Sequence, residues 1–146
     1  MTRTTKKTIL FSLLGLVAIA AGVGFYLYNK GPVDVKHTSG TKVIATELYA
    51  TFSKDSITAK KKYTNTILEA AGTVVRISKN QQNQDIVFLK TNEAGAYVNC
   101  TMEGPAEGIK ENDNIVIKGI CTGMGMGDAD LGILGDVYLG RCYLVK

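Results

Sequence analysis

Three cysteines are the most reactive side chains in this 146-residue chain, and all three fall in segments that predict β-strands. Cys100, Cys121 and Cys142 show no CxxC spacing, and the only histidine is far from them, so the pattern does not favour a metal site. In an oxidising compartment such thiols form disulfides. Any pair is possible, and we predict Cys121–Cys142, which would fasten the last strand and contribute about 3 kcal/mol on the chain-entropy model. The alternative is three small buried hydrophobic residues.

The single histidine, His37, lies in a polar segment that offers neither a set of metal ligands nor a nucleophile to activate. The sequence also identifies no serine or cysteine with a plausible base, and no pair of carboxylates that marks an active-site cleft. We therefore predict a protein that is not an enzyme and has no cofactor or metal ion.

A glycine-rich stretch at 123–135 places Met124 and Met126 close to Asp128 and Asp130. It lacks the GK[ST] ending and the following helix of a phosphate-binding loop. Its aspartates lack the spacing and the terminal glutamate of a calcium loop. We predict a flexible loop with two exposed methionines that contacts a ligand or partner.

The elements that position these residues are five short segments of alternating polarity. They are residues 66–78, 85–91, 96–103, 115–122 and 136–146. Together they predict a mainly β fold, a five-stranded OB-like barrel with strand order 1-2-3-5-4. A bulge near Gly140 or Arg141 would turn the apolar residues of the last segment toward the interior. In this pattern Tyr97 points outward as a candidate surface contact, and Phe88 belongs to the core.

An uncharged stretch of 21 residues, from Thr8 to Tyr28, precedes the barrel. As a helix it would measure roughly 31 Å, the thickness of the hydrocarbon core of a bilayer. Three basic residues stand before it, so the positive-inside rule places the barrel on the extracytoplasmic side. We predict that residues 1–28 form an uncleaved, single-pass anchor in the inner (cytoplasmic) membrane of a bacterium, with the C-terminal domain in the periplasm. A cleaved signal sequence is the alternative.

The segment between anchor and barrel divides into two parts. Residues 29–42 are polar and contain Gly31-Pro32 and Ser39-Gly40, which predicts a linker. Residues 43–63 predict one or two short α-helices that lay an apolar stripe on the barrel, with Asp55 or Ser56 as the cap of the second. Helices and barrel together form one domain, 43–146.

Charge is distributed unevenly along the chain. Residues 1–28 carry +3, residues 29–62 carry +4 and residues 63–146 carry −3. A nucleic-acid-binding domain normally presents a clustered positive surface, which the barrel sequence lacks. Nucleic acid is therefore not the expected ligand.

The domain has a distinctive set of short motifs. They are Ala71-Gly72-Thr73-Val74, Val98-Asn99-Cys100, Asn112 to Gly123, and Asp136 to Cys142. Together these motifs resemble the tRNA_anti-like family over roughly residues 43–146. The resemblance implies an OB-fold domain of a membrane-anchored or exported bacterial protein of unknown function, and it supplies no catalytic residues. The family name records a similarity of fold to anticodon-binding domains, and the 123–135 loop is long for the family.

The function expected from the sequence is that of a membrane-anchored, extracytoplasmic binding module. Its ligand is expected to be a protein or peptide, held by the barrel face at Tyr97 or by the 123–135 loop. The alternative is an OB protein that binds single-stranded nucleic acid.

Overall fold

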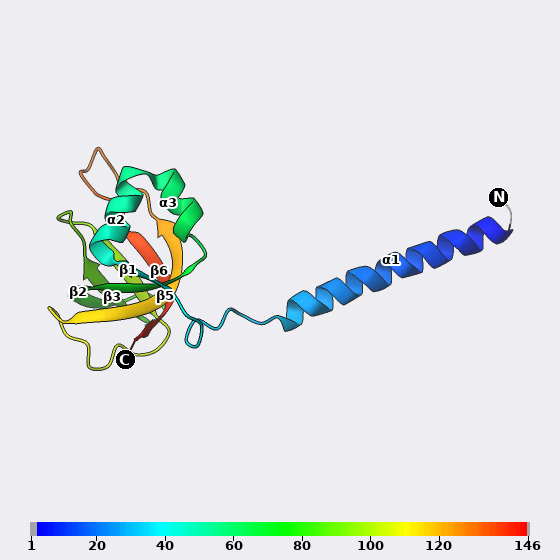
Figure 1. The fold of residues 1–146 in the computed structure, drawn as a ribbon, viewed down its shortest axis with the longest axis horizontal. Coiled ribbons are helices and arrows are strands. Elements are labelled where there is room, and N and C mark those ends of the chain that lie inside the picture. The colour runs from blue at the N-terminus through cyan, green and yellow to red at the C-terminus, as the bar shows by residue number, and fades with distance from the viewer. Residues whose placement is uncertain (1–2, 146) are drawn as a thin grey trace. The chain divides into compact units, whose positions relative to one another are not determined.

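The computed structural model describes residues 3–145; Met1, Thr2 and Lys146 lie outside the described residues, and with them the ends of the predicted anchor and of the predicted fifth strand. The chain divides into two units, the first ending at Val33 and the second beginning at Asp34 (Figure 1). The first unit is α1 (Arg3–Asn29) and the short segment after it. Its stretch Lys7–Asn29 is the one helix in residues 3–145 that is long and apolar enough to cross a membrane.

The second unit contains a closed barrel of five strands. They are β2 (Ile67–Lys79), β3 (Asp85–Lys90), β4 (Tyr97–Met102), β5 (Asn114–Met124) and β6 (Val137–Leu144). Their order is β2-β3-β4-β6-β5, and the barrel closes because β5 also pairs with β2. The pair β4–β6 is parallel and the other barrel pairs are antiparallel. The predicted OB-like barrel and its strand order are confirmed.

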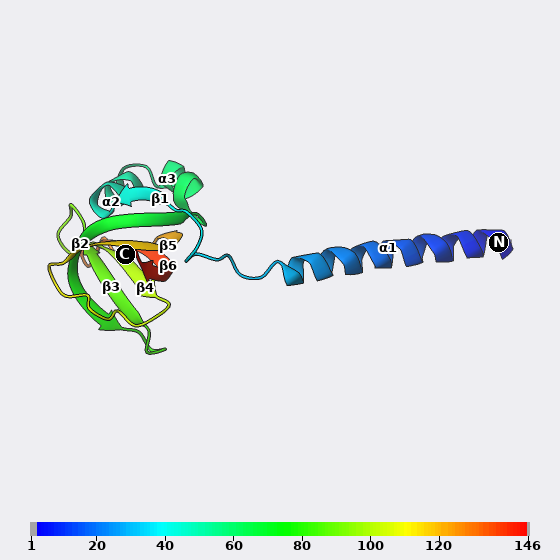
Figure 2. The same ribbon diagram turned by 60° about the horizontal axis from the view of Figure 1, so that its bottom comes forward.

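The long β2 holds the barrel together, because its two halves have different partners. Residues 67–73 pair with β5, and residues 74–79 pair with β3. A register shift between Val74 and Arg76 marks the change. In Figure 2, β2 curves around the barrel as these two pairings require.

The barrel interior follows the predicted alternation. The inward residues Leu68, Ala70 and Val74 of β2 are fully buried. Cys100 of β4 pairs with Leu139 of β6, but Met102 pairs with Cys142, so β6 has one extra residue between the two pairs. Arg141 stands there with a φ of 52°, and the predicted bulge is confirmed.

Two short helices, α2 (Ala45–Lys54) and α3 (Ser56–Tyr63), cover one end of the barrel (Figures 1 and 2). Asp55 separates them as predicted: its carboxylate accepts the Thr58 N–H at 3.1 Å and the Thr58 hydroxyl at 2.6 Å. The helices bury an apolar stripe against the strands. Its members are Ala45, Leu48, Tyr49, Phe52, Ala59 and Tyr63.

The linker between α1 and the folded unit is shorter than the predicted linker, residues 29–42. Residues 41–44 form a strand, β1 (Thr41–Ile44), that pairs in parallel with β2. Val35 is only 1% exposed, and the folded unit begins at Asp34. Residues 34–42 therefore belong to the domain. Thr41 and Lys42 pair with an edge of β2 that no other strand occupies, and Val35 is buried. Only residues 30–33 separate α1 from the second unit.

Candidate functional site

The connection between β5 and β6 is an ordered hairpin. Asp128 and Ile133 exchange two backbone N–H···O hydrogen bonds of 2.8 Å. The Asp128 Oδ1 atom accepts the backbone N–H groups of Asp130 and Leu131 at 3.0 and 3.2 Å. The loop that was predicted to be flexible is therefore organised by its own hydrogen bonds.

Glycine is required in this hairpin because its backbone segments approach one another closely. A Cβ atom on Gly127 would overlap the carbonyl oxygen of Ile133, and one on Gly135 would overlap that of Gly125. At the base, the Gly125 N–H donates to the carbonyl oxygen of Asp136 at 2.8 Å. The repeated glycines thus pack the hairpin and are not a phosphate-binding motif.

The end of the hairpin exposes apolar side chains to solvent. We call the following four residues the apolar tip: Met126, Leu131, Ile133 and Leu134, which are 99%, 71%, 56% and 42% exposed. Asp128 and Asp130 lie among them in the sequence and are also exposed. Met124 differs from the prediction, because it ends β5, is half-buried and packs against the core. Of the two loop methionines, only Met126 is exposed.

A row of side chains crosses the outer face of the sheet beside this hairpin. Arg76, Phe88, Asn99 and Tyr138 are successive cross-strand partners on β2, β3, β4 and β6. The Arg76 guanidinium carbon lies 4.1 Å from the centre of the Phe88 ring and 5.6 Å from that of Tyr97. The two rings meet edge to face at 5.8 Å. We call these five residues the outer row.

Phe88 was predicted in the core; it is buried, but on the outer face of the sheet and outside the core cluster of the barrel. It alternates with Val87 and Leu89, which face the interior and are fully buried. Phe88 is 7% exposed because Arg76 and Tyr97 cover its outward-facing ring. Tyr97 is half-buried on the outer face, where the prediction placed it.

Asp136 connects the hairpin to the outer row. One carboxylate oxygen accepts the Tyr97 backbone N–H at 2.8 Å, and the other accepts the Asn99 side-chain N–H at 2.9 Å. These bonds orient the Asn99 amide so that its Oδ1 atom points elsewhere. Among the described residues that buried oxygen has no hydrogen-bond partner. The sequence assigned no contact to Asp136, and its role as a link between β4 and the hairpin was missed.

The three cysteines are free thiols in the structure, and all are buried. The pKa of the Cys142 thiol is well above its usual value. The main cause is a hydrogen bond with the Cys100 thiol, and burial is the second. Burial also raises the pKa of the Cys121 thiol. Neutral buried thiols are poor nucleophiles and poor metal ligands. The Cys121–Cys142 disulfide stays a prediction, and the structure gives Cys142 a different thiol neighbour, Cys100.

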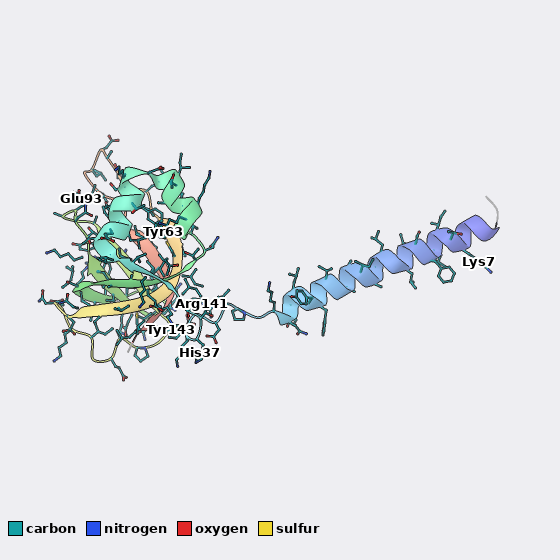
Figure 3. The ribbon with its side chains drawn as sticks, viewed as in Figure 1. Lys7, His37, Tyr63, Glu93, Arg141 and Tyr143 are labelled. Atoms are coloured by element: carbon teal, nitrogen blue, oxygen red, sulfur yellow. The ribbon has the colours of Figure 1, made fainter. Side chains whose placement is uncertain are left out.

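His37 has one side-chain partner, which the sequence did not predict. Its Nδ1 atom lies 2.8 Å from Asp34 Oδ2, and both side chains are exposed. This hydrogen bond lowers the pKa of Asp34 below its usual value. His37 and Tyr143 line one shallow hollow near the start of the folded unit (Figure 3). No three His, Cys, Asp or Glu side chains within the described part of the chain come together as a metal site.

An apolar groove beside β1 is a feature that the sequence analysis missed. It has a volume of about 870 Å³ and is lined by Ile44, Ala71, Val116 and Val145, among others, with Lys90 at its border. Ala71 and Val116 pair across β2 and β5 and interrupt the polar face of these strands. These two small apolar residues at outward-facing positions were the only sign of the groove that the sequence offered. The groove itself depends on β1, which was not predicted.

Comparison with protein families gives a match. A family model described as tRNA_anti-like matches residues 1–131. The match includes α1 and ends within the hairpin, before β6. A comparison with curated proteins gave no match.

Proposed function

The chain belongs to the tRNA_anti-like family, and from this premise we propose that it is a membrane-anchored, non-enzymatic binding module for a protein or peptide. In this proposal α1 is an uncleaved single-pass anchor in the cytoplasmic membrane. The OB-like barrel lies on the extracytoplasmic, periplasmic side, and the ligand is held at the apolar tip and the neighbouring outer row. The observation that carries the proposal is the exposure of four apolar side chains on an ordered hairpin.

The exposed surface of α1 supports the anchor. Phe11, Leu16 and Phe25 are each about two-thirds exposed or more, at 71%, 69% and 68%. A helix with apolar side chains on all sides is stable where its surroundings are also apolar. The proposed direction follows from the basic residues that precede the helix. A phosphatase fused after the last residue is expected to be active in intact cells, and an inactive fusion would contradict the extracytoplasmic location.

The apolar tip supports a protein or peptide ligand. Clustered apolar side chains on a surface mark contact sites more often than single ones do. Because hydrogen bonds already order the hairpin, a ligand that binds it does not have to restrict a mobile loop. The unbranched Met126 side chain can adjust to the shape of a partner. A ligand therefore meets a rigid backbone and one adaptable side chain.

Site-specific photo-crosslinking tests this proposal. A photoreactive amino acid replaces Leu131 in the full-length protein in its own membranes, and the matched control carries it at Gln82, an exposed residue of the β2–β3 turn. We expect one defined protein product from position 131 that is absent from position 82. Crosslinks that are equal at both positions, or absent from both, would show that the hairpin is not a binding surface.

A second candidate function, single-stranded nucleic-acid binding, is favoured by the outer row. OB proteins that bind single strands stack bases on aromatic rings beside basic groups, and the outer row combines Arg76 with Phe88, Tyr97 and Tyr138. Two observations weigh against it: the Phe88 ring is covered, and residues 63–146 carry a net charge of −3. Binding of single-stranded DNA or RNA that falls steeply with salt and is lost in Arg76→Gln would favour this function over the first.

A further inference from the structure

The exposed face of α3 complements the apolar tip. Ile57 lies three and four residues before Lys60 and Lys61, so the three side chains share one face of the helix. Ile57 is 72% exposed, while Ala59 and Tyr63 on the opposite side are buried against the barrel. We call Ile57, Lys60 and Lys61 the α3 face. Like the apolar tip, it presents an apolar side chain next to charged ones.

The two surfaces carry opposite charges. Residues 119–140 contain three aspartates and no lysine or arginine, whereas Ser56–Tyr63 contains three lysines and no aspartate or glutamate. None of the four ion pairs found in residues 3–145 joins the hairpin to α3. Opposite charges around apolar centres favour association of the two surfaces and fix its orientation.

The apolar tip and the α3 face belong to the same end of the domain. The hairpin leaves β5 beside the end of α3, where a Cβ atom on Gly123 would lie 3.6 Å from Thr64 Oγ1. The Asn65 N–H also donates to the Cys121 carbonyl oxygen at 2.8 Å. Two copies related by a two-fold axis at this end can therefore each place the hairpin on the helix of the other. Such an interface forms every contact twice and leaves no unmatched surface.

We propose that the partner of the apolar tip is a second copy of this chain, in a two-fold dimer where the apolar tip of each copy packs on the α3 face of the other. This inference rests on the proposed function, in which the tip is a contact surface, and it names the partner. Two copies anchored in one membrane would meet at a raised local concentration. The dimer buries the four apolar side chains that the single chain exposes.

Charge reversal in the full-length protein tests the dimer. Its mass is measured by analytical ultracentrifugation in a nonionic detergent over a range of protein and salt concentrations. We expect the unmodified chain to form dimers that weaken as salt rises. Lys60→Glu with Lys61→Glu, or Asp130→Lys alone, is expected to raise the dissociation constant about tenfold or more. Asp128 is left unchanged, because its carboxylate holds the hairpin together.

Combining the reversals provides the decisive comparison. The triple variant sets a positive charge at position 130 against two negative charges on the α3 face while Asp128 stays negative, so we expect it to recover part of the dimer affinity that each partial variant loses. Glu111→Lys, at an exposed residue outside both surfaces, is the control and should dimerise as the unmodified chain does. The inference would be overturned if none of the reversals changed the dissociation constant of the dimer, or if the triple variant dimerised no more tightly than the partial variants.

The outcomes also separate this inference from the proposed function. A monomeric chain whose position 131 crosslinks to a different protein overturns the dimer and retains the binding module. A monomeric chain without a crosslink at that position overturns both.

Discussion

Alanine at position 119 is expected to disrupt the packing of the barrel interior. The added Cβ atom would overlap the Cys142 Sγ atom, and it would lie 3.1 Å from the Gly140 carbonyl oxygen and 3.4 Å from the Leu139 Cβ atom. Cys142 is fully buried on β6, so its thiol has no solvent to move into. The strands must therefore separate slightly, or the thiol must take an unfavourable rotamer.

The cost is that of an overpacked core, which is typically about 1–3 kcal/mol. For a folded unit that runs from Asp34 to Lys146, a loss of about 2 kcal/mol lowers Tm by roughly 8 °C. Cys142→Ala removes the overlapping sulfur atom. In that background most of the cost of Gly119→Ala should disappear, which gives a coupling free energy of about 1–2 kcal/mol between the two positions.

Urea and thermal unfolding of the full-length protein measure these effects through tyrosine fluorescence, because the chain contains no tryptophan and buries Tyr49 in its core. The control is Gly104→Ala, where no atom lies within 4 Å of the added Cβ. It should unfold close to the unmodified protein. If Gly119→Ala costs the same with and without the Cys142 thiol, the proposed overlap is not the cause, and the reasoning about the barrel interior is refuted.

Three further predictions concern a helix cap, acid sensitivity and thiol reactivity. Asp55→Ala removes both bonds to Thr58 and should lower Tm by a few degrees, whereas Asp55→Asn keeps an acceptor and should lower it less. The Ala106 N–H, at 2.8 Å, and then Lys79 lower the pKa of Asp85, so its contribution to stability is complete above about pH 4 and is lost as pH falls through the lowered pKa. Asp85→Asn should therefore flatten the stability profile of the domain at acid pH. The three cysteines should resist a maleimide reagent at about pH 8 until the protein unfolds, because all are buried. Unfolding should then release three reactive thiols, or one where the predicted disulfide has formed.

Each of these predictions has a result that would contradict it. An Asp55→Ala variant that melts at the same temperature as the unmodified protein would mean that the cap contributes nothing to stability. An unchanged acid profile in Asp85→Asn would assign the acid sensitivity to other carboxylates. Rapid maleimide labelling of the native protein would mean that the barrel interior opens readily to reagents.

The barrel was predictable because its strands alternate strictly. Leu68, Ala70 and Val74 occupy one face of β2 and are buried together, as the period of two requires. The change of parity in the last strand also indicated a bulge, since Leu139 and Cys142 cannot both face inward without one. Local capping chemistry placed the break between α2 and α3 at Asp55.

The features that were missed depend on contacts between distant residues. β1 has four residues, and none of them is buried, so its sequence shows no alternation. Its position follows from a free stretch of the β2 edge, which no local pattern reveals. Phe88 was assigned to the wrong face of its strand. A guanidinium group and a second ring bury it on the outer face, and its apolar character alone does not distinguish that position from one in the barrel interior. The order of the hairpin is a local feature that was also missed, because its high glycine content suggested a flexible loop and gave no sign of its hydrogen bonds.

The short connection between α1 and the domain bears on how the protein would search for its partner. Five Cα–Cα steps from Asn29 to Asp34 span at most about 18 Å when fully extended. In the anchored state proposed here, the domain therefore diffuses laterally with its helix and samples only a thin layer of solution at the bilayer surface. Encounters are then governed by the number of molecules per unit of membrane area. Lengthening residues 30–33 with a flexible insert would change that encounter rate while leaving both binding surfaces intact.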